Sequence, residues 1–285
     1  MHRFCLLRGM LDLKDILRQH TGYAVPRALL RPLECLLHIE ELNDIISAGR
    51  GLAPQPFLQY VFRRFDVSCE VHYTVRIDDD RYIFVANHPF GALDGMLLAD
   101  MLLRRWRDVG VVVNDMLSHI APLGELWIPV NKFGRQHSAR LYHDSLCSAT
   151  KQILTFPAGL CSRWRDGRVE DLAWQTRFVK DAERYDRRVV PIFVAGELSQ
   201  RFYNIYRLRR ALRISANVEL LLLVDELFRQ RGSRVPIVVG QPIDVLQMAG
   251  SAAARCEAIR QQVYDLKQYV ETAYASSALD SVWRT

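Results

Sequence analysis

The order of strand-like and helix-like segments after residue 69 constrains the fold more than any other feature of this sequence. Stretches with helical periodicity occur at 95–106, 138–149, 172–185, 200–212 and 252–274. Between and around them, seven short runs rich in β-branched and aromatic residues predict strands at 71–77, 82–87, 109–113, 126–130, 152–156, 189–194 and 235–239. Strands that alternate with helices predict an α/β fold, with a largely parallel or mixed central sheet flanked by helices.

The residues before this alternation predict a helical segment. Apolar side chains recur at helical spacing within 1–68, and the breaker Gly49-Arg50-Gly51-Leu52-Ala53-Pro54 divides them. We therefore expect an N-terminal amphipathic helical segment over 1–68 and an α/β domain over 69–285. The segment is equally consistent with a helical cap on the main core and with a surface that touches a membrane.

Composition restricts the class of protein. Hydrophobic residues at 49% and charged residues at 25% are typical of a folded protein. No window approaches the roughly 18 uninterrupted apolar residues of a membrane-spanning helix, and Arg8 and Asp12 interrupt the apolar N-terminus too early for a signal peptide. The six cysteines have no paired spacing, which predicts no metal site, no disulfide framework and a cytoplasmic location.

The charge of the chain favours an acidic partner. A formal net charge of +6 and a pI near 9.1 are compatible with anionic lipid, an acidic carrier protein or nucleic acid. No recognisable nucleic-acid-binding module accompanies the charge, so we do not expect a nucleic-acid partner.

One segment carries most of the chemistry, the run Asn87-His88-Pro89-Phe90-Gly91-Ala92-Leu93-Asp94-Gly95 between a predicted strand and a predicted helix. Pro89 disfavours helical conformation at His88, which is therefore expected at the strand end. A histidine accepts a proton near neutral pH, and a carboxylate holds the imidazole in one tautomer. His88 and Asp94 therefore predict general-base catalysis, and Asp94 is also placed to cap the helix.

Three later strand ends carry polar or turn-forming residues. The first is Leu126-Trp127-Ile128-Pro129-Val130-Asn131-Lys132, which ends in an amide and a cation. The second is Leu154-Thr155-Phe156-Pro157-Ala158-Gly159, a strand that enters a Pro–Gly turn followed by Ser162 and Arg163. The third is Val189-Val190-Pro191-Ile192, whose proline predicts an edge strand or a bulge.

Together and in this order, the four motifs resemble those of the lysophospholipid acyltransferases, the PlsC-like glycerolipid acyltransferase family. That family carries Asn-His, four residues and Asp, then a strand with a polar or basic end, then Phe-Pro-Glu-Gly, then a Val-Pro strand. Here five residues separate His88 from Asp94, and Ala158 replaces the glutamate. This form is similar to a hemolysin-related branch of ornithine-lipid-type acyltransferases, and the resemblance covers residues 82–197.

The resemblance implies an O-acyltransferase of lipid metabolism. A fatty acyl group is expected to pass from an acyl thioester, acyl-ACP or acyl-CoA, to the hydroxyl of a lyso-lipid such as lysophosphatidate or lyso-ornithine lipid. His88 is expected to take the hydroxyl proton while Asp94 orients the imidazole. No Gly-x-Ser-x-Gly elbow indicates a covalent serine intermediate, and amides near Gly91 or Gly159 are candidate oxyanion donors.

The expected partners follow from this reaction. They are acyl carrier protein or a coenzyme A thioester, the lyso-lipid, and an anionic surface of the inner membrane with which the cytoplasmic protein associates peripherally. The thioester is a co-substrate, so no cofactor is expected. The residues expected to bind substrate are Asn87, Gly91, Gly95, Asn131, Lys132, Phe156, Pro157, Gly159 and Arg163. The competing hypothesis is a non-catalytic lipid- or acyl-carrier-binding protein with the same fold.

Several charged or reactive residues have more than one interpretation. Lys132, Arg135 and Arg163 either pair with an anionic headgroup or are solvated cations. Cys161 follows the Pro–Gly turn, but without a nearby histidine it is expected to be a small buried hydrophobe. The segment 200–215 interleaves arginines with aromatic and aliphatic residues, which suits a membrane surface, a structural role or RNA.

Overall fold

The computed structural model of the chain describes residues 27–113, 120–129, 136–165, 167–213, 219 and 222–277. Three helices precede the sheet: α2 (Arg27–Leu36), α3 (Ile39–Ala48) and α4 (Pro54–Phe65). The predicted breaker at 49–54 separates α3 from α4. Pro54 lies in the first turn of α4, where backbone N–H groups have no partner within the helix, so its missing N–H costs no hydrogen bond. Residues 1–26 of the predicted N-terminal segment lie outside the described residues.

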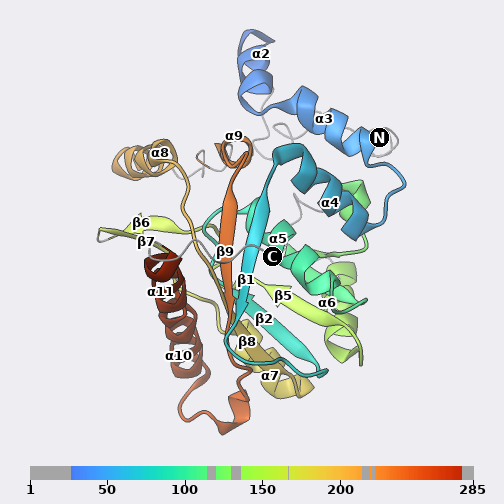
Figure 1. The fold of residues 1–285 in the computed structure, drawn as a ribbon, viewed down its shortest axis with the longest axis vertical. Helices are drawn as coiled ribbons and strands as arrows, with labels where there is room; N and C mark the ends of the chain where they lie inside the picture. Colours follow the sequence, from blue (N-terminus) through green and yellow to red (C-terminus); the bar gives the residue numbers. More distant parts are fainter. Residues whose placement is uncertain are drawn as a thin grey trace.

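All seven predicted strands are present and form one sheet (Figure 1), but the first, predicted at 71–77, lies at 68–73. They are β1 (Ser68–Tyr73), β2 (Tyr82–Ala86), β3 (Val109–Val113), β4 (Trp127–Pro129), β5 (Gln152–Thr155), β8 (Arg188–Val194) and β9 (Arg234–Val239). Their order in the sheet is β1-β9-β8-β2-β5-β3-β4, in which β8, β2, β5, β3 and β4 run parallel. The pair β1 and β9 runs the other way, so the predicted largely parallel or mixed sheet is confirmed.

Helices cover both faces of this sheet (Figure 1). The helices that follow β2 are α5 (Ala92–Leu103), α6 (Gln136–Cys147), α7 (Arg177–Tyr185), α8 (Gln200–Ala211), α9 (Leu223–Arg229), α10 (Ala252–Asp265) and α11 (Lys267–Ser277), with short 3₁₀ turns η2 (Ala121–Leu123) and η4 (Val245–Gln247). Every residue of β2 is buried. Tyr82 and Phe84 enter a core shared with α4 and α5, whereas Ile83 and Val85 enter a core shared with α6, α7 and α10. A strand buried on both faces is apolar throughout, which is why 82–86 shows no alternation.

The position of Pro191 decides between two alternatives, an edge strand and a bulge. The edge strand is wrong, because β8 lies between β9 and β2 in the interior of the sheet. The bulge is confirmed, because Val189 pairs with Ile243 and Ile192 with Val239, so the two residues of β8 between these pairs face three residues of the opposite segment. Pro191 stands where β9 ends, and its carbonyl accepts the Gly240 N–H at 2.8 Å. The missing N–H of Pro191 therefore removes one hydrogen bond at the end of the β8–β9 ladder. A Cβ at residue 240 would lie 2.9 Å from the proline ring, so glycine makes room for it.

Other differences concern short or divided elements. The hairpin of β6 (Arg163–Arg165) and β7 (Arg168–Glu170) was not predicted, because three-residue strands carry no readable periodicity. The helix predicted at 252–274 is divided at Leu266 into α10 and α11. No helix in the described part of the chain is both long and apolar enough to traverse a bilayer.

Candidate active site

Three neighbouring parallel strands bring the sequence motifs together at one end of the sheet. β2 lies between β5 and β8, and the three strands end at Ala86, Thr155 and Val194 on the same side. His88 follows the first of these strands and Phe156 the second. Loops at the carboxyl ends of parallel strands are where α/β folds place ligand sites. The sequence gives only the order of these motifs along the chain, and the sheet places them next to one another in space.

His88 and Asp94 are in contact. Nδ1 of the imidazole lies 2.9 Å from Oδ2 of the carboxylate, the Asp94 side chain is 0% exposed, and the His88 side chain is 18% exposed. Five intervening residues permit this because Gly91 turns the chain with a φ of 81°, a conformation that side chains with a Cβ rarely adopt. With Nδ1 held by the carboxylate, Nε2 is the nitrogen directed away from it, and it has no hydrogen-bond partner among the described residues.

Asp94 also caps the helix that follows. The helix was expected to begin at residue 95, but α5 begins at Ala92 with Gly91 as its N-cap. Oδ2 of Asp94 accepts the backbone N–H groups of Phe90 at 2.9 Å and of Gly91 at 3.0 Å. Burial raises the pKa of Asp94 above its ordinary value, while the contact with His88 and the two amides counteract that rise. The same oxygen of Asp94 therefore caps the helix and orients the histidine.

The Phe-Pro-Ala-Gly turn packs against the histidine. The Phe156 ring stacks on the imidazole with centroids 4.1 Å apart and an interplanar angle of 29°. Pro157 is buried, and Gly159 is exposed in the same turn. On the α5 side, a Cβ at Gly95 would lie 3.8 Å from the Phe156 ring. Contacts of this kind restrict the rotation of the imidazole, which a positioned base requires.

A second buried carboxylate, Asp171, fixes the backbone of His88. Its Oδ1 accepts the His88 N–H at 3.1 Å and the Ser162 hydroxyl at 2.6 Å, and its Oδ2 accepts the Trp174 indole N–H at 2.9 Å. The amide of Ser162 in turn donates to the His88 carbonyl at 2.7 Å. Burial raises the pKa of Asp171, and these donors oppose the rise. Sequence reasoning missed this residue because Asp171 lies 83 positions from His88 and belongs to none of the motifs.

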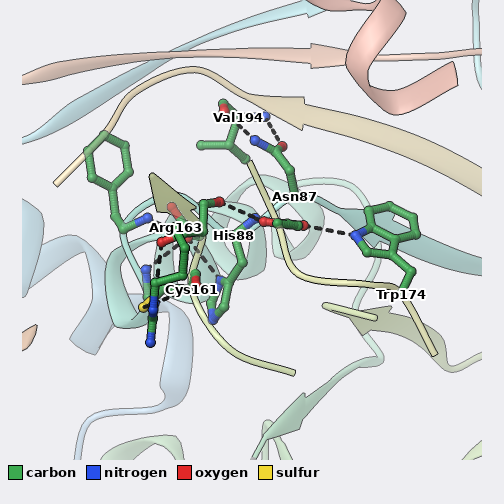
Figure 2. Close-up of polar contacts among 11 residues, drawn as sticks. Asn87, His88, Cys161, Arg163, Trp174 and Val194 are labelled. Atoms are coloured by element: carbon green, nitrogen blue, oxygen red, sulfur yellow. Dashed lines mark hydrogen bonds and ion pairs between the residues drawn. The ribbon is translucent and has the colours of Figure 1, made fainter. Parts of the chain in front are cut away.

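Asn87 serves as a clamp between strands (Figure 2). Its side-chain N–H donates to the Val194 carbonyl at 2.8 Å, and its side-chain oxygen accepts the Val194 N–H at 2.7 Å. The residue is 4% exposed. The amide group therefore continues the β2–β8 ladder beyond Ala86, and it faces the protein interior rather than the open side of the loop.

Arg163 is likewise interior. Its side chain is 1% exposed and lies 3.3 Å from a carboxylate oxygen of Glu219, which is itself 0% exposed. Arg209 of α8 contacts the other oxygen at 2.8 Å. Burying a charge is costly unless it is paired, so this cluster accounts for Arg163 without a ligand. The other predicted binding residues, Asn131 and Lys132, and also Arg135, lie outside the described residues.

Oxyanion donors are expected among the amides near Gly91 or Gly159, and the N–H groups of these two glycines are themselves already engaged. The Gly91 N–H donates to Asp94 at 3.0 Å, and the Gly159 N–H donates to the Phe156 carbonyl at 2.9 Å. Cys161 is 2% exposed, and burial raises the pKa of its thiol to about 11. A protonated, buried thiol is a poor nucleophile, in agreement with the expectation of a small buried hydrophobe.

A hollow lies away from the histidine, and the described residues contain no cluster suited to a metal. A groove of about 760 Å³ lies between α4, β1 and α5, and its lining includes neither His88 nor Asp94. No group of three or more His, Cys, Asp or Glu side chains in the described ranges converges closely enough to hold a metal ion.

Comparison with known proteins identifies relatives across most of the chain. Residues 16–273 match the profile of a protein family described as Acyltransferase. A lyso-glycine lipid O-acyltransferase of Phocaeicola vulgatus is 31% identical over 241 residues, which cover 82% of this chain and 86% of that protein. A lyso-glycine lipid O-acyltransferase of Bacteroides thetaiotaomicron is 30% identical over 265 residues, 90% of this chain and 97% of that protein.

A solved structure also aligns with this fold. The crystal structure of the 1-acyl-sn-glycerophosphate acyltransferase PlsC from Thermotoga maritima covers 82% of this chain and 95% of its own, with 15% identity and a TM-score of 0.44.

Proposed function

Because the chain belongs to this acyltransferase family, we propose that it transfers a fatty acyl group from an acyl thioester to the hydroxyl of a lyso-lipid, with His88 as the general base. The observation that carries the proposal is the 2.9 Å contact between the partly exposed His88 and the fully buried Asp94 at the carboxyl end of the parallel strands.

The reaction follows from this geometry. The hydroxyl oxygen of the lyso-lipid attacks the thioester carbonyl as Nε2 of His88 accepts its proton. The new C–O bond forms, the C–S bond breaks, and the proton passes from the imidazolium to the thiolate that leaves. Asp94 keeps the proton of the neutral imidazole on Nδ1 and stabilises the positive charge that develops. Asp171 and Ser162 hold the His88 backbone in place meanwhile.

The acceptor we favour is a lyso-amino-acid lipid. Both curated relatives act on lyso-glycine lipid by name, and each covers more than four-fifths of the chain. Lyso-glycine lipid is therefore the first acceptor to test, with lyso-ornithine lipid and lysophosphatidate beside it. The donor is acyl-ACP or acyl-CoA, either of which releases a thiol that can be titrated.

The test compares purified wild type with two histidine variants. Thiol release is measured with each thioester donor and each lyso-lipid, and the acylated lipid is identified by mass spectrometry. His88→Ala is expected to lower kcat by about 10²–10⁴-fold, because a positioned base contributes that much. The matched control is His143→Ala, which removes an imidazole that is 54% exposed on α6; its kcat is expected to be unchanged. If wild type releases no thiol with any acceptor, or if His88→Ala equals wild type, the catalytic role is excluded and a non-catalytic binding protein is favoured.

A further inference from the structure

Helix α8 lies at the outer edge of the molecule, beside α9 (Figure 1). Its C-terminal end and the two residues that follow it expose arginines and leucines to solvent. We call Arg207, Leu208, Arg210, Leu212 and Arg213 the α8 face. Leu208 is 59% exposed and Leu212 is 61% exposed. Three residues lie between the two along the chain, and Leu212 is the C-cap of the helix, so both lie at its C-terminal end about one turn apart.

The N-terminal part of α8 is bound firmly to the protein. Phe202 and Tyr203 are buried, and the Ser199 hydroxyl at the helix start donates to the buried Glu226. Arg201 pairs with Asp225 at 3.2 Å, and Arg209 pairs with Glu219 at 2.8 Å. Two arginines of the helix thus neutralise carboxylates of the protein itself.

The three arginines of the α8 face are different. In the described part of the chain, none of Arg207, Arg210 and Arg213 forms an ion pair with a carboxylate, and Arg207 lies over the Trp164 ring at 5.7 Å. A basic residue near a helix C-terminus interacts favourably with the helix dipole, but that effect does not explain two neighbouring leucines left in water. Cations flanking exposed aliphatic side chains complement a surface that is anionic outside and apolar beneath.

The α8 face is also close to the histidine. The Arg163 guanidinium lies over the Phe202 and Tyr206 rings of α8, at 5.0 and 5.1 Å. Its chain neighbour Ser162 donates to the His88 carbonyl at 2.7 Å. One layer of side chains therefore separates the inner side of α8 from the loop that carries the base.

We propose that the α8 face docks the protein on an anionic lipid bilayer, with Leu208 and Leu212 entering the headgroup boundary and the three arginines pairing with lipid phosphates. The proposal rests on the proposed function, because a lyso-lipid acceptor resides in a membrane and its hydroxyl must reach His88 from there. The docking site adds a membrane contact that the acyl-transfer chemistry does not specify.

The test measures vesicle binding apart from catalysis. Sedimentation with equimolar phosphatidylglycerol and phosphatidylcholine vesicles is compared with phosphatidylcholine vesicles alone. The first variant, Leu208→Glu/Leu212→Glu, removes two aliphatic contacts, each contributing on the order of tenfold in partitioning. The second variant, with Arg207, Arg210 and Arg213 all changed to Gln, removes about fivefold per residue. Each is expected to weaken binding to the anionic vesicles by at least about 100-fold.

The matched control is Leu246→Glu. Leu246 is also 61% exposed, but it belongs to η4, near the start of β8, whereas α8 follows the end of that strand. This variant is expected to bind vesicles as wild type does. Three results would each overturn the proposal. Wild type could fail to bind the anionic vesicles, or the leucine and arginine variants could bind them as wild type does. The third result is a control variant that loses as much vesicle binding as the variants of the α8 face. Salt-sensitive binding to RNA in place of vesicles would also overturn it.

Catalysis is read separately on a short-chain lyso-lipid below its micellar concentration, which needs no membrane. The variants of the α8 face are expected to retain wild-type kcat there and to lose turnover only on vesicle-borne acceptor. Failure of wild type to turn over any acceptor would refute the proposed function, and the vesicle measurement would still decide whether the α8 face docks.

Discussion

Replacing Asn87 tests whether the first residue of the His88 motif holds the strands or touches substrate. The sequence placed Asn87 among the substrate-binding residues, while the structure gives its side chain two bonds to the Val194 backbone, at 2.8 and 2.7 Å. Asn87→Ala leaves the Val194 N–H and carbonyl unpaired in a residue that is 1% exposed. Each buried, unpaired polar group costs about 1–3 kcal/mol, so the free energy of unfolding is expected to fall by about 2–6 kcal/mol.

Equilibrium urea unfolding, followed by far-UV circular dichroism, measures this change at constant m-value. Asn204→Ala is the control, because Asn204 is exposed on α8 and bonds only to Gln200 at 3.0 Å among the described residues. A surface change of this kind is expected to alter the free energy of unfolding by less than about 0.5 kcal/mol. Asn87→Ala could instead change the free energy of unfolding as little as the control does and raise KM for the lyso-lipid. That result would show that Asn87 contacts substrate and does not hold the two strands together.

Asn87→Asp sharpens the same test through its pH dependence. The ionised carboxylate can accept the Val194 N–H, but its second oxygen then faces the Val194 carbonyl, which also only accepts. Protonation restores a donor at that position. Burial disfavours the charged form and raises the pKa of the introduced carboxyl, so the stabilising protonated form is present at low pH and is lost as pH rises. The stability gap between wild type and this variant is expected to narrow as pH falls from about 7 towards 5.

Two further predictions concern buried groups around the histidine. Burial raises the pKa of Asp171 in the folded protein, so its contribution to stability is greatest at low pH and declines as pH rises above about 4. The difference in free energy of unfolding between wild type and Asp171→Asn, measured in urea, is therefore expected to shrink as pH rises above about 4. A difference that grows over the same change of pH would mean that the pKa of Asp171 is lowered in the folded protein. Burial raises the pKa of the Cys161 thiol to about 11. Cys161→Ala is accordingly expected to keep kcat within about twofold, and iodoacetamide should label the exposed Cys147 but not Cys161 in native protein. A covalent acyl–Cys161 adduct would contradict this.

The sequence predicted the fold class well because buried parallel strands have a direct signature. The runs at 82–86 and 109–113 are apolar, β-branched or aromatic, and bounded by polar residues, and both are strands. It also selected His88 and Asp94, because Pro89 restricts the conformation of His88 and Gly91 permits the tight turn before the helix, and both effects are local. The hairpin at 163–170 could not be found this way, because its strands pair with each other over three residues and their pattern is too short to read.

What the sequence determined by itself is therefore the set of elements and the residue types able to move a proton. Tertiary structure alone decided which groups meet. It brought Asp94 to His88 across five residues, and it brought Asp171 to the same histidine from 83 positions away. It also turned Asn87 and Arg163 into interior contacts of Val194 and Glu219. The physical reason is that a buried polar group is stable only when partners satisfy it, and the positions of those partners depend on the order of strands in the sheet.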